Sequence, residues 1–297
     1  MRAVVGGVLL GILPNSESRI ADAIAFAREA QIEYSKFGGL ISPSLAPHSL
    51  YTCTRVHWEK MAYAAREIGC LLHTHLQETE RELRDVKELW GATPIQALHQ
   101  IGATQSPLLG AHCVYLDERD LEILSSTRCR VAHNPTSNLK LASGFAPLHL
   151  FVERGIDVGI ATDGAASNND LDMWEEMRLA ALLVKGATRD ATLVSARQAL
   201  EMATIGGARC LGFEREIGSL EVGKKADVVL MNFDQPHLTP RHNVVSHLVY
   251  AAKASDVDSV LVDGNVLVQN GAFKHLDVAR VCADAQKSAS RLVQMRV

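Results

Sequence analysis

The sequence predicts an α/β fold in which parallel strands and crossover helices form a β/α barrel. Short apolar runs alternate with amphipathic helical segments over the first two thirds of the chain, which is the pattern of βαβ units. Five predicted strands end in a residue able to bind a metal, namely His48, His75, His112, His133 and Asp163. Successive members of this series are 27, 37, 21 and 30 residues apart, about one βαβ unit each.

These recurring strand ends favour a barrel over an open sheet. In a β/α barrel the carboxyl ends of all strands meet at one face, where catalytic groups lie. An open doubly wound sheet spreads them along an edge instead. No Gly-x-Gly-x-x-Gly motif follows the first predicted strand, which counts against a nucleotide-cofactor fold.

Six strands are expected from apolar runs bounded by turn-forming residues, at 4–10, 39–47, 70–75, 108–112, 129–133 and 156–161. Helices are expected between and after them, at 19–30, 56–68, 78–90, 117–124, 147–154 and 171–184. In the second helix Trp58, Met61 and Ala65 share one face. Thr93 followed by Pro94 marks the start of a further helix. The Pro-, Ser- and Asn-containing stretch 134–138 reads as a turn.

The texture of the sequence changes after about residue 205. A turn-rich segment at 218–227 precedes short apolar strands at 228–231 and 259–262, and Asp263-Gly264-Asn265 forms a hairpin-type turn. We therefore divide the chain into a partial barrel at 1–212, a small β module at 213–272 and a C-terminal helix at 273–297.

Composition limits the classes of partner. The net charge of -4 argues against a protein that binds a phosphate backbone, so no nucleic-acid partner is expected. The apolar run at 3–13 is too short to span a bilayer and is interpreted as a buried strand rather than a signal peptide, so no membrane partner is expected. Six cysteines without a Cys-x-x-Cys pair indicate reduced thiols in a cytoplasm.

The stretch 71–79 carries the densest chemical signal. His73 and His75 are two residues apart, so on a strand they face the same side, and Glu78 follows just after the strand. A histidine at a strand end beside an acid suits a metal ligand paired with a proton shuttle. A buried strand with one polar face explains the same pattern, so the histidine pair alone decides nothing.

Six stretches together carry a family resemblance: Pro47-His48-Ser49-Leu50-Tyr51, His75-Leu76-Gln77-Glu78-Thr79, Gly110-Ala111-His112-Cys113-Val114, His133-Asn134-Pro135-Thr136-Ser137-Asn138, Thr162-Asp163-Gly164-Ala165-Ala166-Ser167 and Gly218-Ser219-Leu220-Glu221-Val222-Gly223. The chain resembles the amidohydrolase superfamily, and within it the 5-methylthioadenosine/S-adenosylhomocysteine deaminase group. The resemblance implies a metal-dependent hydrolase with an eight-stranded (β/α)8 TIM-type barrel, a small β-sandwich module and one Zn²⁺ or other divalent metal per subunit.

Measured against that resemblance, the chain supplies six barrel strands. The first two strands, their His-x-His metal pair and the opening strands of the β module are missing, which leaves a partial sandwich. We expect an N-terminally truncated family member, because the Leu-Gln-Glu-Thr sequence that follows His75 matches the fifth strand of the family and not the first.

The resemblance implies roles for four catalytic and metal-binding residues. His75 and Asp163 are expected to bind the metal, which would lower the pKa of a bound water towards about 7. Asp163 and Glu78 are expected to move protons, with Glu78 also contacting the purine ring. His112 is expected to contact the bound water or the developing oxyanion. Without the resemblance, Asp163 is explained as a turn residue, Glu78 as an acid at the start of a helix and His112 as a core histidine.

Two further residues are expected to bind substrate. His48 after Pro47 matches a substrate-binding position, and Arg19 loosely matches an arginine that meets the ribose or the carboxyl tail. The plainer alternatives are a loop histidine and a solvated helix arginine. His133 and His73 are expected to pack or to orient neighbouring groups.

The implied reaction is deamination of an adenosine-like thioether, a small-molecule nucleoside, to the inosyl product and ammonia. One alternative is another amidohydrolase activity, of the guanine deaminase or s-triazine hydrolase type. A second is a non-catalytic fragment, because zinc normally takes three or four protein ligands and His75 with Asp163 makes two. The sequence leaves homo-oligomer formation open.

Overall fold

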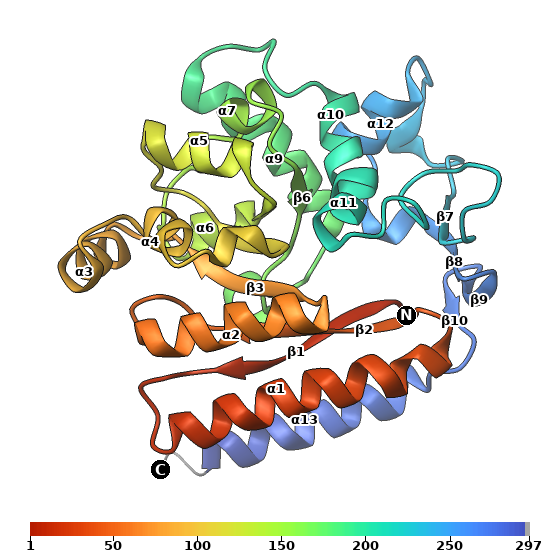
Figure 1. Cartoon of the computed structure of the whole chain (residues 1–297). Coiled ribbons are helices and arrows are strands. Elements are labelled where there is room, and N and C mark those ends of the chain that lie inside the picture. The colour runs from red at the N-terminus through yellow and green to blue at the C-terminus, as the bar shows by residue number, and fades with distance from the viewer. Residues whose placement is uncertain (295–297) are drawn as a thin grey trace.

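A parallel sheet organises the computed structural model, which describes residues 1–294 (Figure 1). Its strands are β1 (Ala3–Leu9), β2 (Ile41–Pro47), β3 (Leu71–Leu76), β4 (Leu108–His112), β5 (Cys129–His133) and β6 (Val158–Ile160). They lie side by side in chain order, and each pairs in parallel with the next. No pairing joins β1 to β6 in the described part of the chain. The predicted α/β class with six parallel strands is confirmed, and the sheet stays open.

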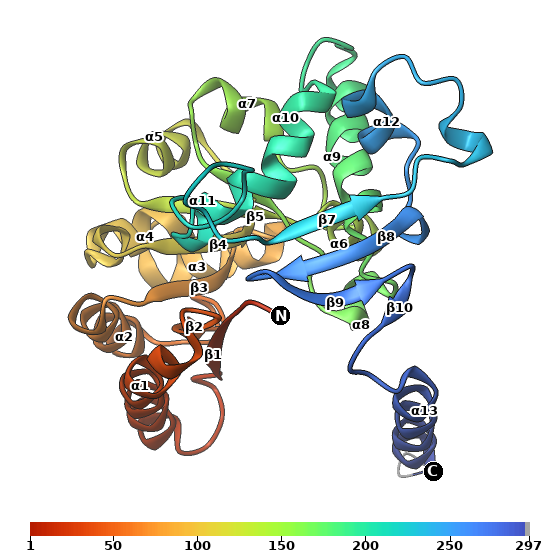
Figure 2. The ribbon, with the colours of Figure 1, turned by 90° about the vertical axis from the view of Figure 1, so that its right-hand side faces the viewer.

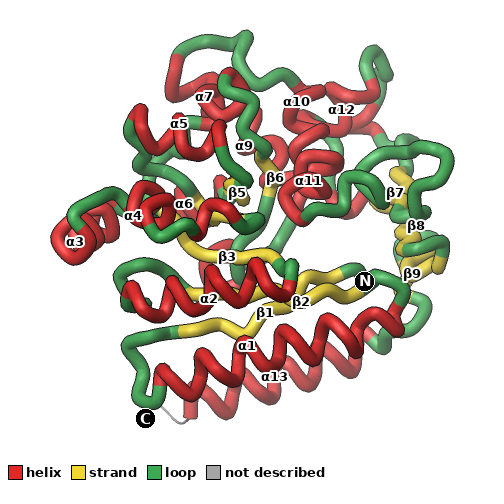
Figure 3. Tube along the Cα trace, in the orientation of Figure 1, coloured by secondary structure: helices red, strands yellow, loops and turns green. Residues whose placement is uncertain are grey.

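Helices follow the strands, and Figure 3 shows this alternation along the trace. The helices are α1 (Ser16–Glu33), α2 (Arg55–Ile68), α3 (Glu80–Trp90), α4 (Pro94–Gln100), α5 (Glu118–Ser126), α6 (Pro135–Lys140), α7 (Leu148–Glu153), α8 (Ala165–Asn168), α9 (Met173–Thr188), α10 (Ala196–Glu201) and α11 (Gly207–Leu211). One turn of π-helix, Met202–Gly206, joins the last two.

Short-range hydrogen bonds explain where these helices begin and end. The side chains of Thr54 and Thr79 accept from the backbone N–H three residues on, at 3.3 Å and 3.1 Å, and so satisfy a donor that the first turn leaves free. Gly69 and Gly91 end α2 and α3 with φ of 75° and 71°, the left-handed conformation that glycine adopts without strain.

The main core lies on the helix-covered face of the sheet. Strand residues alternate, so Leu45, Leu72 and Leu108 point to this face and are fully buried against the helices. Trp58 of α2 and Phe151 of α7 are the largest side chains with no exposed surface. Burying such side chains provides most of the free energy of folding.

The opposite face of the sheet is thinly covered. Only five buried residues form the apolar cluster on this face within the described chain. They come from β3, β4, β5 and α11: Leu71, Leu109, Ala111, Ala132 and Cys210. Nearer the β1 edge, Val8 is 66% exposed, and His73 is exposed as well. The two faces of the same sheet therefore differ sharply in packing.

A second, antiparallel sheet forms the small β module (Figure 2). Its order is β10 (Ala272–Phe273), β9 (Asn265–Gln269), β8 (Val257–Val262) and β7 (Val228–Met231). The guanidinium of Arg2, next to β1, donates to both carboxylate oxygens of Asp227 at 2.8 Å and 3.1 Å, which ties the two sheets together. Between β7 and β8, α12 (Val244–Tyr250) packs on α9 and α10.

The last helix, α13 (Val278–Gln294), has no buried residue and stands apart from the other helices in Figure 2. It lies within the predicted C-terminal segment 273–297 but begins only at Val278, because Phe273 belongs to β10. The end of the predicted helix beyond residue 294 lies outside the described residues. No helix among residues 1–294 has the length and apolar character needed to cross a bilayer.

The strand predictions agree with the structure to within about two residues, and the turn predicted at 134–138 is wrong. Pro135 is the first residue of the short helix α6, where its missing N–H costs nothing. Glu78 also lies before α3, which begins at Glu80, so it is not part of the helix expected to start at 78.

Candidate active site

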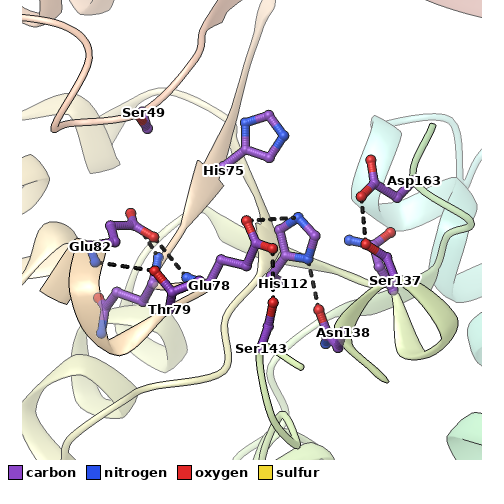
Figure 4. Close-up of polar contacts among 12 residues, drawn as sticks. Ser49, His75, Glu78, Thr79, Glu82, His112, Ser137, Asn138, Ser143 and Asp163 are labelled. Carbon is purple, nitrogen blue, oxygen red and sulfur yellow. Dashed lines mark hydrogen bonds and ion pairs between the residues drawn. The ribbon is translucent and has the colours of Figure 1, made fainter. Parts of the chain in front are cut away.

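The candidate site lies at the carboxyl ends of β3, β4 and β6, where four non-glycine residues adopt positive φ. These are Gln77 at 51°, His112 at 76°, Cys113 at 49° and Asp163 at 63°. Such conformations carry strain and persist where surrounding contacts hold them, often at functional sites. Figure 4 shows that His75, Glu78, His112 and Asp163 face one shared space above these strand ends.

His75 is held in one tautomer by a carbonyl. Its Nδ1 lies 2.9 Å from the backbone oxygen of His48, which can only accept, so Nδ1 carries the proton. The Nε2 lone pair is therefore free, as a metal ligand requires. The ring stacks on that of His112 at 5.6 Å between centroids and 15° between planes.

Glu78 extends from the turn after β3 towards His112. Its Oε1 accepts from the hydroxyl of Ser143 at 3.0 Å, and its Oε2 lies 3.8 Å from His112 Nε2. The side chain of Glu78 keeps 21% exposure, whereas that of His112 has 1%. One carboxylate oxygen is thus fixed while the other faces the site, an arrangement suited to passing a proton.

His112 is oriented from behind by α6. Its Nδ1 lies 2.8 Å from Asn138 Oδ1, so Nδ1 donates and Nε2 presents a lone pair towards Glu78. Two acceptors then face each other across 3.8 Å. The pair can take up one shared proton, which lets either partner deliver it to a bound molecule.

Asp163 accepts two hydrogen bonds. Ser137 donates to Oδ2 at 2.7 Å, and the backbone N–H of Gly164 donates to Oδ1 at 2.6 Å. Burial raises the pKa of Asp163, but these hydrogen bonds outweigh burial, and the pKa ends below its ordinary value. Asp163 is therefore an anion at neutral pH.

Buried groups behind the turn after β3 fix Glu78. The carboxylate of Glu82, 3% exposed, accepts from the backbone N–H of Gln77 at 3.1 Å and of Glu78 at 2.8 Å. The amide of Gln77 in turn donates to Asp120 at 2.8 Å and to the carbonyl of Tyr115. These contacts hold the left-handed conformation of Gln77 from which Glu78 projects.

The other predicted residues differ in their burial and in how close they lie to the candidate site. The His48 ring lies 4.6 Å from that of His75 between centroids, and burial lowers its pKa, as does His75. His133 is buried, and burial lowers its pKa to about 4. His73 lies on the same strand face as His75 but is exposed. Arg19 lies on the exposed side of α1, and its role in substrate binding stays a prediction.

The described residues provide part of a metal site. His75 offers an imidazole nitrogen and Asp163 a carboxylate, which is donor chemistry that zinc accepts. Within residues 1–294, however, no group of three or more His, Cys, Asp or Glu side chains could hold a metal ion. Residues 1–294 alone therefore do not form a complete zinc site.

The sequence model of the Amidohydrolase family matches residues 1–267, and the chain belongs to this family. It is 46% identical over 294 residues to a 5-methylthioadenosine/S-adenosylhomocysteine deaminase from Desulforudis audaxviator. That match covers 99% of this chain and 68% of the relative. The predicted superfamily and deaminase group are confirmed.

Solved structures show the same fold. An adenosine deaminase from Xanthomonas campestris with bound zinc superposes with a TM-score of 0.93 at 35% identity, over 99% of this chain and 66% of its own. An atrazine chlorohydrolase from Arthrobacter aurescens in complex with zinc superposes with a TM-score of 0.88 at 25% identity. That match covers 97% of this chain and 66% of the chlorohydrolase chain. The chain thus spans about two thirds of the length of these proteins, and the zinc in both supports a divalent metal for this fold.

The sequence patterns assigned no role to the supporting residues Glu82, Ser137, Asn138 and Ser143. Glu82 had a signal, because Thr79 three residues earlier gives the Thr-x-x-Glu spacing of a capping box. In the structure Thr79 caps α3, but the Glu82 carboxylate accepts from Gln77 and Glu78 instead of Thr79. Ser143 had none, since it meets Glu78 across 65 positions of sequence.

Proposed function

We propose that this site deaminates an adenosine-like thioether, 5-methylthioadenosine or S-adenosylhomocysteine, to the inosyl product and ammonia. The observation that carries the proposal is the pairing of Glu78 with His112, beside His75 and Asp163, at the strand ends. The relatives named above and the identity over nearly the whole chain support the same activity.

Hydrolytic deamination needs a proton delivered to the purine ring and a proton removed from water. Glu78 has a free carboxylate oxygen turned to the site, and it delivers the proton to the ring nitrogen next to the carbon under attack. Asp163, ionised at neutral pH, accepts the proton of the attacking water and passes it to the exocyclic nitrogen, so that the C–N bond breaks and ammonia leaves. The hydroxyl proton of the intermediate returns to Glu78 as the carbonyl of the product forms. His112, protonated on Nδ1, accepts or returns a proton at Nε2 and then stabilises developing charge on oxygen.

Substrate binding falls to residues around this centre. His48 lies against His75, and its ring reaches the same space, where it contacts the nucleoside. Arg19 contributes the contact with the ribose or carboxyl tail. We propose zinc, one per subunit, as the metal, with His75 and Asp163 as two of its ligands. Within residues 1–294 no third His, Cys, Asp or Glu side chain completes a group able to hold the metal, so we assign only these two ligands.

We further propose that the open parallel sheet is an arc of a (β/α)8 barrel, supported by the likeness to amidohydrolase structures. The division at residues 212 and 272 follows the change from parallel to antiparallel strands, with α12 as a helix that packs back on α9 and α10. A cytoplasmic location is supported by six free cysteines, five of them buried.

A substrate panel tests the function. The full chain, supplied with excess zinc, is incubated with 5-methylthioadenosine, S-adenosylhomocysteine, adenosine, guanine and an s-triazine, and ammonia release is measured. We expect the two thioethers to be deaminated fastest. Faster turnover of guanine or of the triazine contradicts the proposal and selects the alternative amidohydrolase activity.

The incomplete ligand group favours one further candidate, a chain that is not catalytic by itself. In that case zinc binds weakly to the isolated protein, and deamination is slight. Isothermal titration with zinc measures this directly. Tight binding of one zinc per chain, with measurable deamination of 5-methylthioadenosine, rules it out.

A further inference from the structure

Glu176, near the start of α9, is a buried carboxylate without a basic partner in the described chain. It has no exposed surface, and burial raises its pKa. No ion pair to a Lys, Arg or His reaches it within residues 1–294. A buried carboxyl group costs free energy unless its oxygens accept hydrogen bonds, so its contacts define what it does.

Each oxygen of Glu176 holds a different segment. Oε2 accepts from the backbone N–H of Thr136 at 3.1 Å, and Oε1 accepts from Asn168 Nδ2 at 2.5 Å. Thr136 lies in the first turn of α6, and Asn168 ends α8, five residues after Asp163. The carboxylate therefore bridges the segments that follow β5 and β6.

These two segments carry the groups that orient the candidate catalytic residues. In α6, Ser137 donates to Asp163 and Asn138 accepts from His112, at 2.7 Å and 2.8 Å. Lys140 of α6 also donates to the carbonyl of Ala166 at 2.9 Å. A six-residue helix gains little stability from its own hydrogen bonds, so the position of α6 depends on such anchors.

We propose that Glu176 is a positioning residue of this site, which places α6 so that His112 and Asp163 keep their partners. It touches no reacting atom and acts through Thr136 and Asn168. The inference rests on the proposed function only where it treats His112 and Asp163 as catalytic.

Replacement by the isosteric amide isolates the effect. In Glu176→Gln one of the two acceptors becomes an N–H₂ group that faces a donor, either the Thr136 N–H or Asn168 Nδ2. Rotating the Asn168 amide only moves the conflict, because Asn168 Oδ1 already accepts from the Leu171 N–H at 2.7 Å. One buried donor is left unpaired in every arrangement.

A second substitution gives every donor and acceptor around position 176 a partner again. With Asn168→Asp added, the introduced amide accepts from Thr136 and donates to the new carboxylate, which still accepts from Leu171. The negative charge moves from position 176 to position 168, and the hydrogen-bond pattern is complete again. A side chain that only fills space at 176 gains nothing from this exchange.

The test combines ¹⁵N NMR of the His112 ring with kinetics. The Asn138 Oδ1 that faces Nδ1 of His112 assigns the proton to Nδ1 in the wild-type chain. Glu176→Gln should shift His112 towards the other tautomer and lower kcat for 5-methylthioadenosine about 10²-fold with KM little changed. The double variant Glu176→Gln with Asn168→Asp should restore both. Glu175→Gln, an exposed neighbour on the same helix, is the matched control.

An unchanged His112 tautomer in a folded Glu176→Gln protein overturns the proposal, as does a double variant that stays altered. If Glu176→Gln does not fold, the double variant decides alone, because restored folding with the wild-type tautomer supports the proposal and its absence refutes it. The NMR measurement needs no turnover, so failure of the proposed deamination is seen separately.

Discussion

The carboxyl-end rim of the parallel sheet, which carries Glu78, His112 and Asp163, and the C-terminal helix α13 are both rich in polar residues. They differ in which parts of the chain their side chains contact. At the rim, Glu78, His112 and Asp163 each have a hydrogen-bond partner from another segment. In α13 no residue is buried, and the described polar contacts of its side chains lie within the helix or its first turn. The side chains at the strand ends are therefore fixed by groups from other segments, whereas α13 is held by few contacts with the rest of the described chain.

The largest effect is expected in the core that supports the rim. Phe151 of α7 is fully buried, and truncation to alanine leaves a cavity against the helix-covered face of the sheet. Phe151→Ala should lower the free energy of unfolding by about 3–5 kcal/mol. Urea denaturation measures the change. A loss below about 1 kcal/mol would mean that α7 is as loosely held as α13.

Removing a support of the rim should cost less. Glu82→Ala leaves the buried N–H groups of Gln77 and Glu78 without an acceptor, a loss of about 1–3 kcal/mol. Because burial raises the pKa of Glu82, its stabilising contribution is complete below pH 4.5 and declines as pH rises through the folded-state pKa.

The loss caused by Glu82→Ala should therefore be larger at pH 4 than at pH 7 in denaturant titrations. Glu80→Ala, at an exposed position on the same helix, serves as the control. A loss that grows with pH would show that Glu82 is a stabilised anion, contrary to this account.

A smaller effect is expected where the two sheets join. Arg2→Met removes the two hydrogen bonds to Asp227 and should cost about 1 kcal/mol at pH 7. Arg2 lowers the pKa of Asp227 in the folded protein. The stabilisation by this pair is therefore present above the pKa of Asp227 in the unfolded chain and is lost as pH falls through its pKa in the folded protein. Unfolding at pH 7 and pH 3 should show the difference between wild type and variant shrinking in acid.

The smallest effect is expected in α13. Leu292 is 65% exposed, and Leu292→Ala should change the free energy of unfolding by less than about 0.5 kcal/mol. The measurement is the same urea denaturation at pH 7. A loss comparable to that of Phe151→Ala would show that α13 is packed in solution and would remove the contrast drawn here.

The sequence predicted the strands well because each is an apolar run closed by a turn former or a helix start. The order of His75, His112 and Asp163 then placed the site at one rim, since parallel strands bring their carboxyl ends together. Local chemistry explains this success, because every one of these signals lies within a few residues.

The remaining features depend on long-range contacts. Residues 134–138 contain turn formers, yet they form α6, which is held by Asn138 to His112 and by Thr136 to Glu176, 26 and 40 positions away. Ser143 reaches Glu78 in the same way. No pattern within a short window carries such pairings, so the sequence pointed to the candidate reacting residues but not to the groups that support them.

The central claim, that Glu78 carries the proton in deamination, is tested most directly by one comparison of rates. Ammonia release from 5-methylthioadenosine is measured with excess zinc for the wild-type chain, Glu78→Gln and the exposed control Glu80→Gln. We expect Glu78→Gln to lose about 10²–10⁴-fold in kcat while the control stays near wild type. A Glu78→Gln protein as active as the wild type would contradict the account.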